Sequence, residues 1–229
     1  MQGLIFDFDG LIVDTEWPAF QTWQEVYQAY GCSLSLSVYA ACIGSPGAFD
    51  PHAHLEARIG RVLDREHIRL QRRQRYVELT GSQALLPGVE GYITEAKRLG
   101  LKLGVASSSS REWVVGHLVR FGLHEYFDCV TCRDDATAVK PDPELYRLAL
   151  AALELPAAQV IALEDSPNGV LAARRAGIFC VAVPNTITCR LSLAHADMCV
   201  PSLAEVPLEQ LLARVGKNGP TYRRDGKGE

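Results

Sequence analysis

Residues 3–16 read Gly-Leu-Ile-Phe-Asp-Phe-Asp-Gly-Leu-Ile-Val-Asp-Thr-Glu, and this stretch decides how the rest of the chain is interpreted. The apolar run 4–6 has the length of a buried strand, and it ends in Asp7 and Asp9 with Gly10 directly behind them. Two carboxylates at a strand end are costly to bury unless a cation or a reaction uses them. The alternative is a strand end with solvated acids and a turn glycine, and the other strand ends decide between the two.

The composition is that of an ordinary globular protein. The chain has 229 residues and a formal net charge of −4, which suits one large domain or a core with a smaller insert. This charge gives no bulk attraction to nucleic acid or to an anionic membrane, so we expect neither as a partner. No apolar run approaches the roughly 20 residues that span a bilayer, and no leader segment is recognisable, so we expect a cytoplasmic protein. Its seven scattered cysteines are expected to be reduced.

Helices and buried strands alternate from residue 85 onward. Strands are predicted over 102–106, 126–132, 159–163 and 178–183, and helices of about ten residues separate them. One of these helices is predicted to begin at Pro143 with Asp142 as its N-cap. The alternation predicts an α/β fold with right-handed crossovers and a doubly wound parallel sheet.

Residues 15–85 interrupt this alternation with helical sequence. An aromatic stripe (Phe20, Trp23, Tyr27, Tyr30) ends at Gly31, and a last helix is predicted from Asp64 to Gly81. The arginines of that last helix are expected on a solvated face: Arg65, Arg69, Arg72, Arg73 and Arg75. We therefore expect a core of residues 1–14 and 86–215, a helical insert over 15–85, and a flexible tail over 216–229.

Polar side chains close several of the predicted strands. Ser107 follows the second strand, Lys140 lies in the loop after the third, and Glu164 and Asp165 close the fourth. Because ligands of open α/β sheets bind beyond the carboxyl ends of the strands, we expect these groups to converge with the acids of the first strand. Grouped acids repel one another unless a cation lies between them, and ligands that are all oxygen indicate Mg²⁺ rather than zinc.

Four motifs in this order resemble those of the haloacid dehalogenase-like hydrolase superfamily. They are Asp7-Phe-Asp9-Gly, Ser107 after an apolar strand, Lys140 in Lys-Pro-Asp-Pro-Glu-Leu-Tyr, and Glu164-Asp165-Ser166 before a helix. The insert resembles the small helical cap of that superfamily, and Leu86-Pro87-Gly88 resembles the return to the core in its β-phosphoglucomutase-like branch. The resemblance implies a Rossmann-like core with the cap inserted after the first strand.

The resemblance also implies a role for each matching residue. Asp7 would be the nucleophile that forms an aspartyl-phosphate, and Asp9 the general acid that later acts as the base for water. Ser107 and Lys140 would bind the transferring phosphoryl group, with backbone donors near Gly10 and Ser108. Mg²⁺ would be held by Asp7, the Asp9 carbonyl and Asp165, and Glu164 would be a direct or an outer ligand.

The resemblance implies a Mg²⁺-dependent phosphatase that hydrolyses a small phosphorylated metabolite such as a sugar phosphate. We expect it to be a monomer. The cap would select the substrate, because a closing lid excludes water and contacts the leaving group. Candidate cap residues facing the site are Glu16, Trp17, Phe20, Gln21, Gln24, Phe49 and His52.

A hexose-phosphate mutase is the alternative enzyme. Mutases of the branch carry a cap His and a cap Arg where this sequence reads Trp17-Pro18-Ala19-Phe20 and Gly44-Ser45-Pro46-Gly47, so hydrolysis is favoured. Phosphonatases need a cap lysine, and residues 15–85 contain none. A phospho-accepting signalling domain places its paired acids before the phosphorylated aspartate and has no helical insert, so the motif order speaks against it. A binding protein without activity is disfavoured because every catalytic group is present.

Overall fold

A parallel six-stranded sheet forms the centre of the protein. The computed structural model describes residues 1–44 and 49–218, and within them the strand order is β3-β2-β1-β4-β5-β6. The strands are β1 (Gly3–Phe6), β2 (Lys102–Ala106), β3 (Cys129–Thr131), β4 (Val160–Glu164), β5 (Phe179–Ala182) and β6 (Met198–Cys199). All neighbouring pairs run parallel, which confirms the doubly wound sheet predicted from the alternation of elements. The central strands β1 and β4 lie side by side, with Phe6 opposite Leu163.

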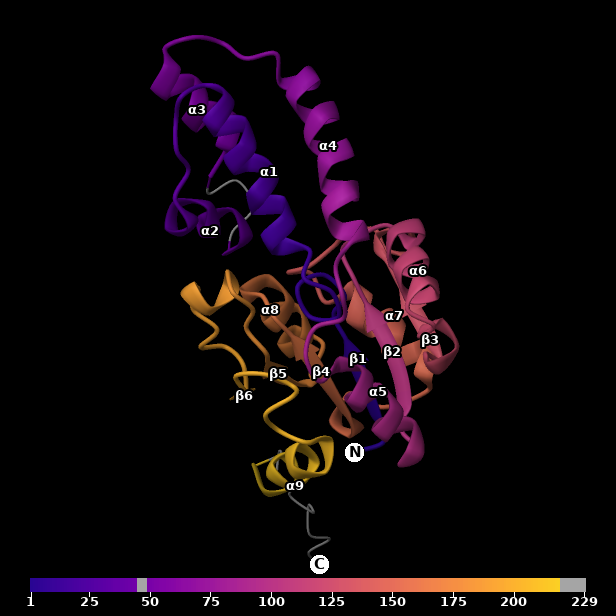
Figure 1. Ribbon diagram of the computed structural model, residues 1–229. Coiled ribbons are helices and arrows are strands. Elements are labelled where there is room, and N and C mark those ends of the chain that lie inside the picture. The colour runs from indigo at the N-terminus through magenta and orange to yellow at the C-terminus, as the bar shows by residue number, and fades with distance from the viewer. Residues whose placement is uncertain (45–48, 219–229) are drawn as a thin grey trace, which may run out of the picture.

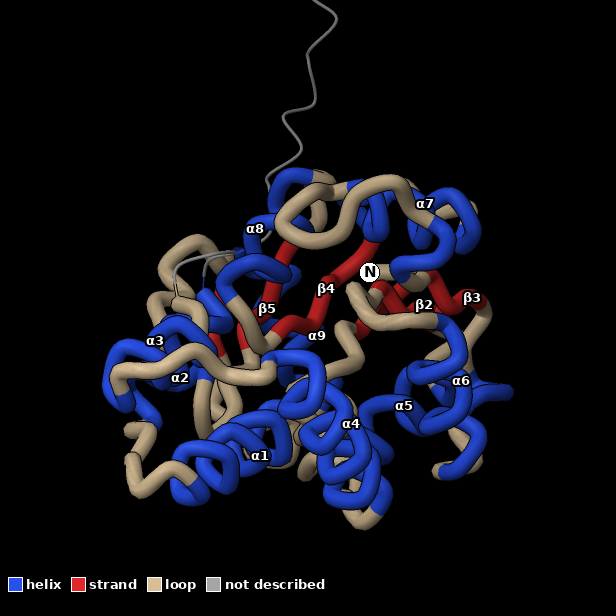
Figure 2. Tube along the Cα trace, turned by 90° about the horizontal axis from the view of Figure 1, so that it is seen from above, coloured by secondary structure: helices blue, strands red, loops and turns tan. Residues whose placement is uncertain are grey.

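Helices cover both faces of the sheet, as Figure 2 shows from above. On one face pack α5 (Val89–Arg98), α6 (Arg111–Arg120) and α9 (Leu208–Asn218), and on the other pack α7 (Glu144–Leu153) and α8 (Pro167–Arg175). Single 3-10 turns lie at His124–Tyr126, Arg133–Asp135, Ala157–Gln159 and Thr188–Arg190. Side chains of β1 alternate between the two layers, because Leu4 and Phe6 join one apolar cluster and Ile5 joins the other. Both faces of the sheet are therefore buried, as the apolar strand sequences require.

Four helices form a separate layer beyond the carboxyl ends of the strands (Figure 1). They are α1 (Glu16–Ala29), α2 (Leu36–Gly44), α3 (Pro51–Ile59) and α4 (Arg65–Gly81), and we call them the cap. Three members of the predicted aromatic stripe, Phe20, Trp23 and Tyr27, are buried in an apolar cluster of the cap. The Asp64 side chain accepts a 3.0 Å hydrogen bond from the backbone N–H of His67, so it is the predicted N-cap of α4.

Two segments connect the cap to the core, and they run side by side. Val13 forms an antiparallel bridge with Leu85, and the N–H of Leu86 donates to the carbonyl of Ile12 at 2.9 Å. Arg120 of α6 donates to the carbonyl of Gln83 at 3.1 Å and to that of Thr80 at 3.3 Å. The guanidinium therefore ties the end of the last cap helix and the return segment to the core.

Several element boundaries differ from the prediction. The strand expected over 126–132 is limited to Cys129–Thr131, because the chain before it makes a 3-10 turn. Helix α7 begins at Glu144 rather than Pro143, although the Asp142 side chain still accepts from the N–H of Glu144 at 2.9 Å. Helix α9 continues through residues 216–218, where a flexible tail was expected, and residues 219–229 lie outside the described part.

The arginine face of α4 is exposed at Arg65, Arg69, Arg73 and Arg75, as predicted, and only Arg72 is half-buried. The Arg72 guanidinium lies 3.7 Å from the centre of the Trp23 ring, and Arg65 pairs with Glu56 and Asp50 of the α3 region. These contacts hold α4 against the other cap helices because arginine can stack on an aromatic face while it donates to acceptors.

Two cysteines at the end of the sheet, Cys129 and Cys132, lie on opposite sides of it. Cys129 packs against the α7 and α8 side of the sheet, whereas Cys132 is buried on the opposite side, as expected for positions three apart in extended chain. The cysteines that the structure describes are free thiols. Among the described helices, none combines the length and the apolar character that a membrane crossing needs.

Candidate active site

A buried lysine joins two acids that come from neighbouring strands. Asp7 follows β1 directly, and its backbone N–H donates to the carbonyl of Leu163 at 2.9 Å, which fixes it beside the end of β4. Lys140 Nζ donates to Asp7 Oδ1 at 2.7 Å and to Glu164 Oε1 at 2.6 Å. All three side chains are buried: that of Lys140 is 5% exposed, that of Asp7 9% and that of Glu164 0%. One ammonium group therefore compensates two carboxylates that have left water.

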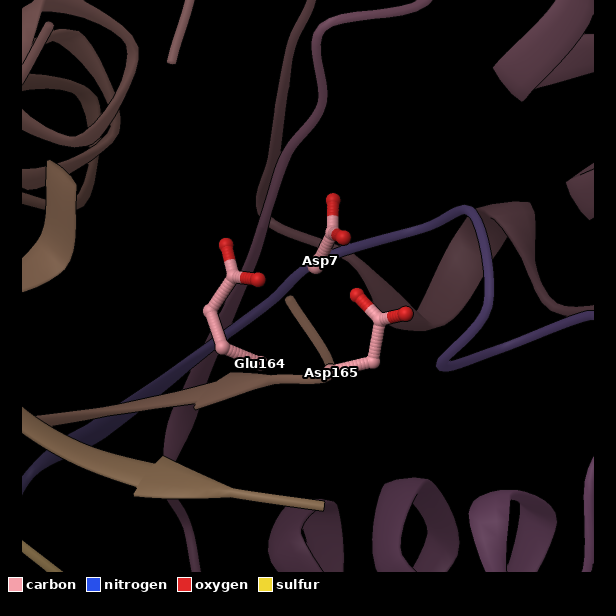
Figure 3. Close-up of side chains that lie close together, drawn as sticks. All are labelled: Asp7, Glu164 and Asp165. Atoms are coloured by element: carbon pink, nitrogen blue, oxygen red, sulfur yellow. The ribbon is translucent and has the colours of Figure 1, made fainter. Parts of the chain in front are cut away.

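Asp165 completes a group of three acids, which Figure 3 shows converging from β1 and the end of β4. Carboxylate oxygens of Asp7, Glu164 and Asp165 lie within 4.8 Å of one another. Burial, with the charge of Glu164 adding to it, raises the pKa of Asp7 to about 7 even though Lys140 opposes the shift. Burial and the charge of Asp7 also hold the pKa of Asp165 well above its usual range. The cluster thus carries more acid than one lysine neutralises.

The donor set of this cluster fits a divalent cation. Glu164 Oε1 accepts from Lys140 and, at 2.5 Å, from the Tyr146 hydroxyl, but Glu164 Oε2 is buried without a hydrogen-bond partner. Buried polar atoms are nearly always satisfied, so an orphaned carboxylate oxygen beside two further carboxylates is an unfilled requirement for positive charge. Because all the candidate ligands are oxygen atoms, the set suits a hard divalent cation.

Asn185 orients Asp165 from the end of β5. Its Nδ2 group donates to Asp165 Oδ2 at 2.8 Å and to the carbonyl of Gly10 at 3.1 Å. Gly10 has φ +76°, and a Cβ atom there would come within 2.4 Å of Asp165 Oδ2. Glycine is therefore needed both for the left-handed turn after Asp9 and for the close approach of the chain to Asp165.

Asp9 lies apart from the three-acid cluster, and its carboxylate is bound by the segment after β2. Asp9 Oδ2 accepts from the Ser109 hydroxyl at 2.6 Å and from the Ser107 hydroxyl at 3.3 Å, while Asp9 Oδ1 accepts from Trp113 Nε1 at 3.0 Å. Ser107 is completely buried, and its Oγ accepts from the backbone N–H of Ser109 at 3.0 Å. The two aspartates of the first motif thus have different surroundings.

A cavity of about 450 Å³ lies between these groups and the cap. Its lining combines core and cap residues: Asp7, Asp9, Ser108, Val139, Lys140, Asp165, Ser166 and Asn168 from the core, and Glu16, Ala19, Tyr39 and Ile43 from the cap. Glu16 begins α1, and burial together with the charges of Asp9 and Asp14 raises its pKa to about 8. The cap therefore places a carboxyl group over the acids of the core.

The other candidate cap residues lie elsewhere. Phe20 is 2% exposed inside the cap, Trp17 is 39% exposed and packs on Phe20, and Gln24 is absent from the residues that line the described cavity. Phe49 and His52 pack on rings of the cap interior rather than on this cavity, and Gln21 is likewise not among its lining residues. Helix α1 must cover the cap interior as well as the cavity, so most of its large side chains serve the interior.

Sequence reasoning did not identify several residues that contact the candidate site. Asn185 lies three residues beyond the end of β5, so the rule that ligands meet strand ends could have found it. Ser109 and Trp113 lie in and just beyond a serine-rich segment that leads into α6, where an indole has no evident link to a carboxylate 104 residues earlier. Tyr39 belongs to a cap helix, and its place depends on how cap and core pack.

Comparison with known proteins agrees with the four motifs. Residues 4–183 match the family model described as haloacid dehalogenase-like hydrolase. A protein of Bacillus subtilis (strain 168) named "Putative phosphatase YhcW" is 45% identical over 212 residues, covering 93% of this chain and 96% of that protein. Validoxylamine A 7'-phosphate phosphatase of Streptomyces hygroscopicus subsp. limoneus is 30% identical over 204 residues, covering 88% of this chain and 94% of that protein.

The fold is also similar to a solved structure that contains phosphate. The crystal structure of CbbY from Rhodobacter sphaeroides in complex with phosphate superposes with a TM-score of 0.69 at 33% sequence identity. The match covers 90% of this chain and 96% of that one, so it includes the cap as well as the sheet.

Proposed function

Because the chain belongs to the haloacid dehalogenase-like hydrolase family, we propose that it is a Mg²⁺-dependent phosphatase of a small phosphorylated metabolite. The observation that carries the proposal is the contact of Lys140 with Asp7 and Glu164 beside Asp165, at the floor of a cavity roofed by the cap. A site built from one nucleophilic carboxylate, one ammonium group and an oxygen-only cation cluster suits phosphoryl transfer, where most of the catalysis is placement of opposite charge.

Asp7 would attack the phosphorus atom. A bond forms between an Asp7 oxygen and phosphorus while the bond from phosphorus to the leaving oxygen breaks, which gives an aspartyl-phosphate. Asp7 Oδ1 is held by Lys140, whose ammonium group also faces the incoming negative charge. Asp7, the Asp9 carbonyl and Asp165, with Glu164 beside them, would hold Mg²⁺, and its charge would keep these carboxyls ionised and attract the phosphoryl group.

Asp9 would move the proton in both half-reactions. It gives a proton to the leaving alkoxide in the first, and in the second it takes a proton from the water that attacks phosphorus, which releases phosphate and frees Asp7. Ser107, with the backbone near Gly10 and Ser108, would hold the phosphoryl oxygens. This division of roles is supported by the separate surroundings of the Asp7 and Asp9 carboxylates.

The cap supports an uncharged, hydroxyl-rich leaving group such as a sugar. In the part of the cap that the structure describes, the cavity is lined by Glu16, Ala19, Tyr39 and Ile43, none of which is cationic, and the undescribed residues 45–48 are Ser-Pro-Gly-Ala in sequence. A carboxyl and a phenol can exchange hydrogen bonds with hydroxyl groups, whereas a second phosphate would find no positive partner there. Cytoplasmic location and a monomeric state stay predictions.

Two measurements test this proposal. Hydrolysis of p-nitrophenyl phosphate is expected to require Mg²⁺ after treatment with EDTA and to be lost in Asp7→Asn, while Glu125→Gln, at an exposed acid, stays active. Full activity of Asp7→Asn would contradict the assignment of Asp7 as the nucleophile.

Fructose 1-phosphate should be hydrolysed at least about tenfold more efficiently than fructose 1,6-bisphosphate, because leaving one charge unpaired in a site costs more than about 1.4 kcal/mol. Glu16→Lys should reduce the ratio of the two efficiencies, because it adds a positive charge that a second phosphate can contact. A wild-type preference for the bisphosphate, or a ratio that Glu16→Lys leaves unchanged, would contradict the proposed substrate class.

A hexose-phosphate mutase is the alternative function. It is tested by incubation with β-glucose 1-phosphate, because a mutase yields glucose 6-phosphate and a phosphatase yields free phosphate. The cap positions that carry His and Arg in mutases of the branch hold other residue types here, so free phosphate is the expected product.

A further inference from the structure

The Asp9 carboxylate is held by two donors from the segment that starts α6. The Ser109 hydroxyl donates to Oδ2 at 2.6 Å, and the Trp113 indole N–H donates to Oδ1 at 3.0 Å. Each oxygen is thereby fixed by a separate donor, so rotation of the carboxylate breaks at least one charge-assisted hydrogen bond. The mechanism described above uses Asp9 and Ser107 but leaves the indole of Trp113 without a role.

An indole N–H is a donor and cannot accept a proton. It can therefore fix Oδ1 through the whole reaction without competing for the proton that Asp9 carries. The Ser109 hydroxyl differs in this respect, since it can both donate and accept. Trp113 is accordingly suited to setting the direction of the carboxylate, not to proton transfer.

The indole itself is supported from the cap. Tyr76 of α4 stacks on the Trp113 ring, with 5.3 Å between ring centres and an angle of 18° between planes. His117 of α6 contacts the same ring at 4.3 Å, and its Nδ1 is 2.9 Å from the Trp113 carbonyl. Burial and the nearby carboxylates of Asp9 and Glu16 raise the pKa of Tyr76, so its phenol stays neutral beside them. The support of Asp9 therefore includes one residue from each side of the cap–core boundary.

We propose that Trp113 is a positioning residue for Asp9, and that Tyr76 makes this support depend on the placement of cap helix α4 against α6. The proposal rests on the proposed phosphatase function for its kinetic consequences. Its structural part, the indole-to-carboxylate hydrogen bond with the stacked phenol behind it, is independent of which reaction the site performs.

The hydrogen bond is tested by the indole resonances of protein labelled with ¹⁵N-tryptophan. Three tryptophans give three Nε1–H cross-peaks, and Trp113→Phe identifies the one from Trp113. Asp9→Ala is expected to move that proton resonance upfield because the charged acceptor is lost, while Asp14→Ala, whose carboxylate bonds the backbone N–H of Trp17, leaves it in place. A Trp113 resonance that does not respond to Asp9→Ala overturns the proposal.

The kinetic test uses two leaving groups. An alkyl phosphate needs a proton from Asp9 to release its alkoxide, whereas p-nitrophenolate leaves without one. Trp113→Phe keeps the ring stack and removes the N–H. The value of kcat/KM for an alkyl phosphate should then fall about tenfold, which is the size of one hydrogen bond to a charged group. The value for p-nitrophenyl phosphate should fall less than about twofold. Equal losses on both substrates would show a merely structural role and overturn the proposal.

Matched variants separate the cap contact from the hydrogen bond. Tyr76→Phe retains the stacked ring and should behave as the wild type, whereas Tyr76→Leu removes the ring and should reproduce the leaving-group dependence of Trp113→Phe. Trp17→Phe, at a partly exposed tryptophan of the cap, is the control for loss of an indole. A Tyr76→Leu variant with wild-type kinetics on both substrates overturns the cap link. A wild-type protein inactive on both phosphate esters would refute the proposed function, and the indole resonances would still decide the contact.

Discussion

Removal of the Lys140 ammonium group is expected to destabilise the protein strongly when no divalent cation is present. Lys140→Met keeps most of the side-chain volume but leaves Asp7 and Glu164 without the donor that contacts them at 2.7 and 2.6 Å. Both acids are almost fully buried, so water cannot replace the ammonium group. Breaking a buried ion pair by removing one partner costs about 3–5 kcal/mol, and we expect a loss in that range.

The measurements are urea unfolding and thermal melting at neutral pH in EDTA, both followed by circular dichroism. For a chain of this length each kcal/mol corresponds to about 2–4 °C, so in the thermal melt the melting temperature should fall by roughly 6–20 °C. Addition of Mg²⁺ should restore part of the loss, because a cation at the three-acid cluster compensates the same charges.

The matched control is Lys97→Met. Lys97 pairs with Asp128 at 3.1 Å, but the two side chains are 34% and 40% exposed, so its loss should cost at most about 1 kcal/mol. A second variant, Lys140→Met with Glu164→Gln, should recover stability relative to Lys140→Met alone because one uncompensated charge is gone. If Lys140→Met lost no more stability than Lys97→Met, the ammonium group would not be compensating buried charge, and the reasoning would be refuted.

Three further outcomes follow from the same structure. Burial raises the pKa of Asp7 from 3.8 to about 7 and that of Glu16 from 4.5 to about 8, so the folded state binds more protons than the unfolded state between these values. In EDTA the free energy of unfolding should therefore decrease as the pH rises from about 4.5 to 8. When this free energy is measured by urea unfolding at several pH values, its dependence on pH should be weaker in Asp7→Asn than in the wild type. Asn185→Ala should weaken Mg²⁺ binding about tenfold or more in calorimetry, because Asp165 loses its orienting donor at 2.8 Å; an unchanged affinity would argue against that role. Gly88→Ala should destabilise the protein by more than about 2 kcal/mol, since Gly88 has φ +87° and a Cβ there would lie 2.3 Å from the backbone nitrogen of Ala204. Gly91 has open space around it, so Gly91→Ala should stabilise the helix by about 0.5–1 kcal/mol in thermal melts.

The strand ends were the most informative part of the sequence. Asp7 and Asp165 are far apart in the chain, but β1 and β4 are neighbours in the sheet, so the carboxyl ends of parallel strands bring the two acids together. Lys140 reaches the same place from the loop before α7. Strand alternation and residue type sufficed here, because topology alone determines which strand ends meet.

Residues whose position depends on packing between cap and core were not predictable in the same way. The helical period of α1 marks Phe20 as apolar, but it does not say whether that side chain faces the cavity or the cap interior, and the interior contains it. Trp113 is likewise an ordinary apolar helix residue until the first turn of α6 is placed beside Asp9. Tertiary contact, rather than local pattern, determines the surroundings of both rings.

The adjacent pair of connections between cap and core has a consequence for evolution. Residues 12–13 leave the core beside residues 85–86, so both ends of the inserted segment are anchored at one point beyond the carboxyl end of β1. An insertion with closely spaced ends can be lengthened, shortened or exchanged as a unit without shifting the strands on either side of it. Lineages descended from one core of this kind can therefore acquire new substrates by replacing the insertion, while the residues that perform the chemistry are inherited unchanged.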